Sequence, residues 1–145
     1  MSSRRQRALA LGADVVTANK GPLADSPEIF QRLMGRQREG GGLTRGEATV
    51  GAGLPVMDTL EMLVASGDLL QEVQGCLSGT LGFISDALGR GVPLSEAVAQ
   101  AQKLGYTEPD PAVDLSGLDV ARKAIILARM AGWEITEDAV QVDGL

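Results

Sequence analysis

Apolar residues recur every three or four positions in several stretches of this chain, and glycine or proline separates one stretch from the next. Such spacing is typical of amphipathic helices, because residues three or four apart lie on one helix face. The pattern predicts helices over residues 1–11, 26–38, 55–66, 81–89, 93–106 and 119–131. Before the last of these, Pro109 and Pro111 predict an extended or turned segment that is not helical.

Shorter apolar runs predict strands over residues 14–18, 43–50, 69–77 and 139–142. The first run follows a predicted helix and Gly12, and it ends in the polar residues Asn19 and Lys20. This order is typical of a βα crossover unit in a parallel sheet, so the predicted fold class is α/β. A glycine run ending at residue 42 marks the predicted boundary between two domains, residues 1–40 and 41–145.

Composition narrows the classes of function. The chain has 145 residues, of which 44% are hydrophobic, and a net charge of −6. An acidic chain is a poor partner for nucleic acid, and no apolar run is long enough to span a bilayer. The lack of histidine excludes Ser-His-Asp and Cys-His mechanisms, so proton transfer falls to Lys, Asp, Glu, Tyr or water. The single cysteine, Cys76, fits a reducing cytoplasm, and we expect it to face the core.

The stretch from Gly105 to Lys123, GYTEPDPAVDLSGLDVARK, carries most of the candidate chemistry. Asp119 and Lys123 are four residues apart and share a helix face, a spacing that often means only a surface salt bridge. The apolar run after Lys123 indicates a largely buried helix, however, so its first turns are expected at the mouth of a pocket. A lysine beside carboxylates there suits proton transfer or substrate orientation.

Two connections after predicted strands are candidate ligand sites. Lys20 follows the first strand, at the sheet edge where parallel sheets bind ligands, although a solvated loop lysine fits equally. The turn Ser78-Gly79-Thr80 precedes a helix, whose free N–H groups can receive a carboxylate or a phosphate. Simple N-capping by Ser78 or Thr80 is the alternative, and it is compatible with ligand contact.

The loop over residues 51–55, GAGLP, is a candidate cation site. It lacks the third glycine of a dinucleotide fingerprint and ends in proline, which argues against nucleotide binding. A loop of small residues exposes backbone carbonyl oxygens, which suit a hard cation. Glu47, just before the loop, is either a ligand of that cation or a plain surface acid.

The segments VVTANK, VGAGLPV, SGT, GYTEPDP and DLSGLDVARK follow one another between Gly12 and Gly132, and together they closely resemble the homoserine dehydrogenases. The resemblance is greatest to the branch fused to an aspartokinase. It implies interconversion of L-homoserine and L-aspartate 4-semialdehyde with NADP or NAD, in threonine, methionine and isoleucine biosynthesis. It also implies an α+β substrate domain, with a mixed sheet covered by helices on one face, after the last βα portion of a Rossmann-type domain.

The resemblance assigns chemical roles to the acids and the lysine of the central stretch. Lys123 would donate and accept the proton of the reacting oxygen. Asp119 would bind the substrate and orient that oxygen. Glu108 would bind the substrate ammonium group, and Asp114 would have a supporting role.

Cofactor, substrate and cation contacts follow from the same resemblance. Lys20 and Gly105 would contact the cofactor, and Lys20 would also face the reacting oxygen. Residues 78–80 would contact substrate or cofactor. A structural sodium ion would be held, mainly through carbonyl oxygens, by Glu47, Val50, Ala52 and Leu54. The expected assembly is a cytoplasmic homodimer that pairs through its substrate domains.

The resemblance covers a middle piece of the family pattern. Family members begin with a glycine-rich dinucleotide-binding segment, which does not precede Val15 here, and they have further strands after the position of Leu145. The alternative hypothesis is therefore a non-catalytic module, which dimerises and binds an amino acid or a cation without turnover.

Overall fold

The computed structural model describes residues 4–35 and 41–145, which form two compact units. The first unit contains Met1–Glu72 and Arg122–Val140, and the second contains Val73–Ala121 and Gln141–Leu145. This grouping by contacts differs from the domain boundary expected near residue 40, which stays a prediction. None of the helices in the described ranges is long and apolar enough to cross a membrane.

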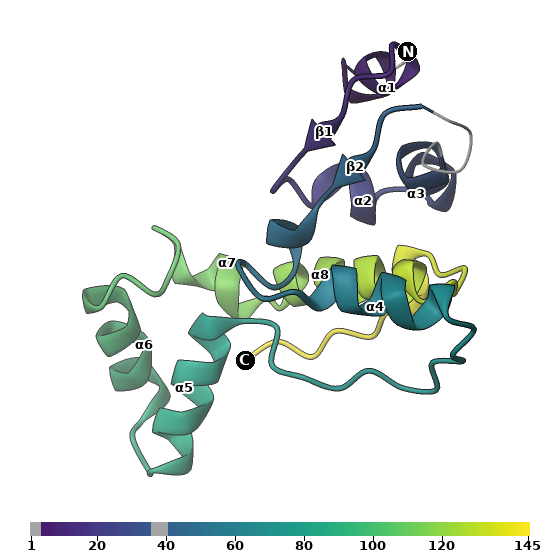
Figure 1. Cartoon of the computed structure of the whole chain (residues 1–145). Coiled ribbons are helices and arrows are strands. Elements are labelled where there is room, and N and C mark those ends of the chain that lie inside the picture. The colour runs from purple at the N-terminus through teal and green to yellow at the C-terminus, as the bar shows by residue number, and fades with distance from the viewer. Residues whose placement is uncertain (1–3, 36–40) are drawn as a thin grey trace. The chain divides into compact units, whose positions relative to one another are not determined.

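A small parallel sheet lies in the first unit, where β1 (Val15–Val16) pairs with β2 (Thr44–Arg45) (Figure 1). A parallel pair needs a crossover connection, and α2 (Gly21–Ala24) and α3 (Pro27–Met34) supply it. The predicted α/β fold class is confirmed, and a strand follows Gly12 as expected. The strands are much shorter than the runs over residues 14–18 and 43–50 from which they were predicted.

Close packing surrounds the start of this sheet. Helix α1 (Arg4–Ala10) ends before Gly12, whose φ of +78° is the left-handed conformation that often follows a helix. A Cβ atom at Gly42 would lie 2.1 Å from the carbonyl oxygen of Ala13, so only glycine fits there. The backbone N–H of Leu43 donates a hydrogen bond to Oδ1 of Asp14 at 2.7 Å. This bond joins the residues that directly precede β1 and β2.

The sequence signals at the start of α3 are confirmed. The Oγ atom of Ser26 accepts a hydrogen bond from the N–H of Ile29 at 3.3 Å, and Pro27 occupies the first helical position. The last residues of the predicted helix, 36–38, lie outside the described ranges.

Two longer helices complete the first unit, α4 (Val56–Ala65) and the greater part of α8 (Leu118–Met130). Two short 3-10 turns, η2 (Glu47–Thr49) and η3 (Glu137–Ala139), belong to it as well. Apolar side chains exposed by 8% or less form its core: Leu9, Leu23, Ala24, Phe30, Leu33, Val50, Met57, Leu60, Ile125, Ile126, Leu127 and Ala128.

The second unit is built on a pair of helices, α5 (Gly79–Gly89) and α6 (Leu94–Lys103), which pack against each other (Figure 1). The buried residues between them are mostly small: Ile84, Ala87, Ala97 and Ala101. Small side chains let the two backbones approach closely. Helix α7 (Pro111–Leu115) follows and contacts α5.

Several sequence expectations are wrong. Residues 69–77 and 139–142 form no strands, and the mixed sheet expected for the substrate portion does not form among the described residues. The runs have apolar residues, but a strand also needs a neighbour to receive its hydrogen bonds, and no described segment pairs with them.

The prediction that Pro109 and Pro111 exclude a helix is also wrong. Pro111 is the first residue of α7, where its missing N–H and fixed φ are favourable. Asp110 caps this helix by accepting a hydrogen bond from the N–H of Ala112 at 3.0 Å.

Candidate functional site

The residues predicted to carry chemistry are divided between the two units. The first unit contains Lys20, Lys123 and the proposed cation loop over residues 47–54. The second contains the residues predicted to contact substrate, which are Ser78, Gly79, Thr80, Glu108 and Asp119, together with the predicted cofactor contact Gly105 and the supporting acid Asp114. Each group has its own local geometry.

Lys20 lies where predicted, directly after the carboxyl end of the β1 segment, as the N-cap of α2. Side chains fix the turn on which it sits. The hydroxyl of Thr17 accepts from the N–H of Asn19 at 3.1 Å, and the Asn19 carboxamide oxygen accepts from the N–H of Gly21 at 3.0 Å. The half-buried Lys20 therefore stands on a short turn whose backbone is held by hydrogen bonds.

Asp119 and Lys123 both lie in α8, one helical turn apart, and both are half-buried. The predicted burial of the following apolar residues is confirmed, since Ile125, Ile126 and Leu127 are at most 2% exposed. Helix α8 therefore carries Asp119 and Lys123 in its first turns, and its buried second half holds the helix in place.

Arg129 is the charged anchor of that buried half, and sequence reasoning missed it. Arg129 is only 5% exposed, and its guanidinium donates to the carbonyl oxygens of Leu23, Asp25 and Ile135 at distances between 2.7 and 3.2 Å. It also lies 6.0 Å from the centre of the Phe30 ring. A detectable signal existed, because Arg129 is four residues after Ile125 and so shares its buried face.

Burial lowers the pKa of the Arg129 guanidinium from its ordinary value, because the charged form loses hydration. The carboxylates of Asp25, Glu137 and Glu28 act in the opposite direction. The Arg129 guanidinium therefore hydrogen-bonds to neutral carbonyl oxygens and has acidic side chains nearby.

A cavity of about 570 Å³ lies in the first unit. Apolar residues of α3, α4 and α8 dominate its walls, among them Phe30, Met34 and Val64, together with Arg129. None of the predicted site residues lines it. Its polar lining consists of Gln31, Glu61 and Arg129, and Glu61 also pairs with Arg45 at 3.2 Å.

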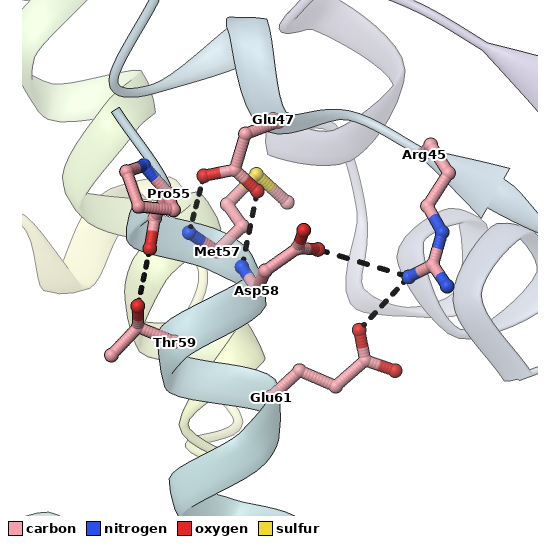
Figure 2. A network of polar contacts seen from close by, with 7 residues as sticks. All are labelled: Arg45, Glu47, Pro55, Met57, Asp58, Thr59 and Glu61. Atoms are coloured by element: carbon pink, nitrogen blue, oxygen red, sulfur yellow. Dashed lines mark hydrogen bonds and ion pairs between the residues drawn. The ribbon is translucent and has the colours of Figure 1, made fainter. Parts of the chain in front are cut away.

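Glu47 acts as a cap for α4, a role that was not predicted. Figure 2 shows its carboxylate directed at the first turn of the helix, where Oε1 accepts from the N–H of Met57 at 2.8 Å and Oε2 from the N–H of Asp58 at 3.0 Å. A negative charge at a helix N-terminus is stabilising. Nearby, Arg45 pairs with Glu61 at 3.2 Å and with Asp58 at 3.8 Å.

The predicted cation loop offers a cation mainly backbone carbonyl oxygens. Both carboxylate oxygens of Glu47 already accept helix N–H groups, and no cluster of three or more His, Cys, Asp or Glu occurs in the described ranges. The loop does contain Ala52 in the left-handed conformation, at φ 52°, and the Leu54 carbonyl already accepts from the N–H of Val56 at 2.8 Å. Carbonyl oxygens have a second lone pair, so cation binding by them stays a prediction.

The Ser78-Gly79-Thr80 turn begins α5, as expected. Ser78 is the N-cap, and its Oγ atom accepts from the N–H of Leu81 at 3.2 Å, so the capping interpretation is confirmed. Thr80 is 7% exposed and its hydroxyl donates to the carbonyl oxygen of Tyr106. Contact of this turn with a ligand stays a prediction.

Asp114 connects three segments of the second unit. Its Oδ2 atom accepts from the N–H of Glu108 at 2.8 Å, and its Oδ1 atom lies 3.3 Å from the Thr80 hydroxyl. The Tyr106 ring adds an edge-on contact with Phe83 of α5, with ring centres 5.3 Å apart. The structure therefore brings together Thr80, Glu108 and Asp114, three of the predicted site residues.

Cys76 is exposed, which makes the expectation that it faces the core wrong. It lies in the segment that forms no strand, and its Sγ atom is 3.2 Å from the carbonyl oxygen of Ser78. The apolar character of the run over residues 69–77 suggested burial, but no partner segment covers it in the described structure.

Comparisons with known proteins agree with the resemblance drawn from the motifs. The profile of the homoserine dehydrogenase family matches residues 55–145. The chain is 42% identical over 143 residues to a homoserine dehydrogenase of Emericella nidulans, covering 94% of this chain and 39% of that protein. It is 45% identical over 139 residues to a bifunctional aspartokinase/homoserine dehydrogenase of Haemophilus influenzae, covering 96% and 17%.

Solved structures give the same result. A Candida auris protein of unknown function superposes with a TM-score of 0.89 at 36% identity, over 97% of this chain and 41% of that one. A hyperthermophilic archaeal homoserine dehydrogenase in complex with NADPH superposes with a TM-score of 0.75 at 30% identity, over 88% and 39%. The chain thus spans less than half of each of these relatives.

Proposed function

The chain belongs to the homoserine dehydrogenase family, and we propose that it carries the substrate-binding and proton-transfer residues for the NAD(P)-dependent interconversion of L-homoserine and L-aspartate 4-semialdehyde. The reaction belongs to threonine, methionine and isoleucine biosynthesis. The observation that carries the proposal is the family match over residues 55–145, which includes Glu108, Asp114, Asp119 and Lys123. The match makes the non-catalytic module the less favoured alternative.

The proposed proton chemistry rests on α8. Lys123 protonates the carbonyl oxygen as it becomes an alkoxide, and it takes the proton back in the reverse direction. Asp119, one turn earlier, binds the substrate and orients the reacting oxygen. Both residues are half-buried, and partial removal from water strengthens such charge interactions.

The ammonium group of the amino-acid substrate needs an anionic partner, and we assign that role to Glu108. Its side chain is exposed, while its backbone N–H is held by Asp114 at 2.8 Å. Ser78, Gly79 and Thr80 are proposed to line the same substrate site from the start of α5.

A nicotinamide cofactor, when bound, supplies or accepts the hydride. The residues present fit such a group in part: Lys20 follows β1 at the sheet edge where α/β folds bind ligands. Gly105, at φ +73°, provides a position without a Cβ atom for close approach. A relative of known structure was solved with NADPH, which supports NADP or NAD as the cofactor here.

Four further assignments accompany this function. A sodium ion bound by carbonyl oxygens of Glu47, Val50, Ala52 and Leu54 would brace the loop before α4, with the Glu47 carboxylate remaining the helix cap. The chain would act in a homodimer, and its location would be cytoplasmic, which the single Cys76 supports.

The domain boundary near residue 40 is likewise proposed, and the family match beginning at residue 55 supports it.

The direct test is oxidation of NADPH by the purified chain in the presence of L-aspartate 4-semialdehyde. The expected result is turnover that Lys123→Ala abolishes and Lys103→Ala leaves unchanged, because Lys103 is an exposed lysine at the end of α6. Circular dichroism confirms that both variants are folded. A folded wild-type chain without turnover would contradict catalysis by this chain.

A further inference from the structure

The loop that carries Glu108 joins α6 to α7 and runs over residues 104–110. Gly105 opens it in the left-handed conformation, and the N–H of Tyr106 donates to the carbonyl oxygen of Ala101 at 3.0 Å. Asp110 closes it as the N-cap of α7. Both ends of the loop are thus defined by helix termini, and Glu108 lies between them.

We propose that Asp114 is a positioning residue, which fixes the backbone of Glu108 so that the Glu108 carboxylate is presented to the ammonium group of the substrate. The inference rests on the proposed function, in which Glu108 binds that ammonium. It assigns Asp114 a definite action through Glu108 rather than contact with the substrate.

The first support is the hydrogen bond between the two residues. The carboxylate of Asp114 accepts the backbone N–H of Glu108 at 2.8 Å, six residues away. Hydrogen bonds to a charged acceptor are stronger than neutral ones. A bond to the backbone fixes the direction from which the Glu108 side chain leaves the loop, and it leaves that side chain's own carboxylate available.

The second support is the anchoring of the loop to α5, next to Asp114. Thr80, only 7% exposed, places its hydroxyl between the carbonyl oxygen of Tyr106 and Oδ1 of Asp114. A hydroxyl has one hydrogen to donate, and the Tyr106 carbonyl is the closer acceptor. The edge-on contact of the Tyr106 ring with Phe83 holds the same loop on the same helix.

Two measurements on the full chain test this role. The first is hydrogen exchange of the Glu108 amide by NMR, which needs no ligand. The second is the affinity for L-homoserine and for 4-hydroxybutanoate, which is the same molecule without the amino group. A positioning role for the ammonium partner predicts loss of affinity for homoserine alone, whereas a general structural role would weaken both ligands.

In Asp114→Ala, we expect exchange of the Glu108 amide to become roughly tenfold faster. Affinity for homoserine falls by roughly fivefold or more, while affinity for 4-hydroxybutanoate stays within about twofold. Asp114→Asn retains one acceptor oxygen and gives intermediate values, and it replaces the alanine variant if that variant does not fold. Asp86→Asn, an exposed acid on α5, is the matched control and changes neither measurement.

Unchanged exchange of the Glu108 amide in Asp114→Ala, or equal loss of affinity for both ligands, overturns the proposal. If the wild-type chain binds neither ligand, the proposed function fails for this chain. The amide exchange still decides whether Asp114 holds Glu108, so the two failures are distinguishable.

Discussion

The guanidinium of Arg129 donates a hydrogen bond of 2.9 Å to the carbonyl oxygen of Leu23, which precedes it by 106 positions in the chain. Leu23 belongs to α2, the short helix capped by Lys20, and Arg129 belongs to α8, the helix that carries Lys123. One buried side chain therefore links the two elements on which the proposed lysines stand.

Replacement of Arg129 by methionine tests the contribution of this link to stability. The variant leaves the carbonyl oxygens of Leu23, Asp25 and Ile135 without their buried donor, so we expect a loss of about 2 kcal/mol or more in the free energy of unfolding. Urea denaturation followed by fluorescence of the single tryptophan, Trp133, measures it within the same unit.

Arg122→Met is the matched control, because Arg122 is an exposed arginine of the same helix. It should change the free energy of unfolding by less than about 0.5 kcal/mol. Equal effects of the two substitutions would show that the Arg129 hydrogen bonds do not stabilise the unit.

Glu47 provides a second test, because its two carboxylate oxygens cap α4. Glu47→Ala should destabilise the fold by about 1 kcal/mol, and Glu47→Gln by less, since the amide keeps one acceptor oxygen. Thermal unfolding measured by circular dichroism compares both with Asp68→Ala, an exposed acid beyond the end of the same helix. An alanine variant as stable as the wild type would rule out the cap.

The close approach at Gly42 predicts a strong effect of one methyl group. Gly42→Ala forces a Cβ atom against the carbonyl oxygen of Ala13 and should destabilise the protein by about 1–3 kcal/mol. At Gly53 an added Cβ meets nothing within 4 Å, so Gly53→Ala is the control and should be nearly neutral. Denaturation midpoints that do not differ between the two variants would contradict the packing described at β1.

A pH-dependent effect is expected at the start of α3. A hydrogen bond from Ser26 holds the pKa of the Glu28 carboxyl below its ordinary value. A carboxyl whose pKa is lowered by folding stabilises the native state above its ordinary pKa, and this contribution is lost as the pH falls through the folded-state pKa. Ser26→Ala should therefore raise the pKa of Glu28 toward its ordinary value.

NMR titration of the Glu28 carboxyl in the wild type and in Ser26→Ala checks this expectation. Asp138 is an internal control, because its pKa is lowered by a different hydroxyl, that of Thr136, and should not change. The idea fails if Glu28 titrates identically in both proteins.

The positions of the longer helices could be predicted because their signals are local. The Ser26 and Ser78 caps and the apolar run after Lys123 each depend on residues within a few positions of one another. The α7 helix was missed for a local reason as well, since Pro111 was interpreted as a helix breaker although proline is favourable at a first position.

What could not be predicted depends on partners distant in the sequence. The segment over residues 69–77 has the composition of a strand, but its conformation depends on whether another segment pairs with it. The contacts of Arg129 with Leu23 and of Thr80 with Asp114 join residues 106 and 34 positions apart. The spacing of residue types along the chain does not predict such long-range contacts. The resemblance to a family named the candidate residues, and the structure gives the contacts that hold several of them.

The measurement that tests the central claim most directly is calorimetric titration of L-homoserine into the wild-type chain, Glu108→Gln and Glu96→Gln. Glu96 is an exposed glutamate on α6 of the same unit. The account predicts saturable binding to the wild type, roughly tenfold or greater weakening in Glu108→Gln because a charged hydrogen bond to the ammonium is lost, and no change in Glu96→Gln. A folded wild-type chain that does not bind homoserine, or that binds it equally well with Gln at position 108, would contradict the account.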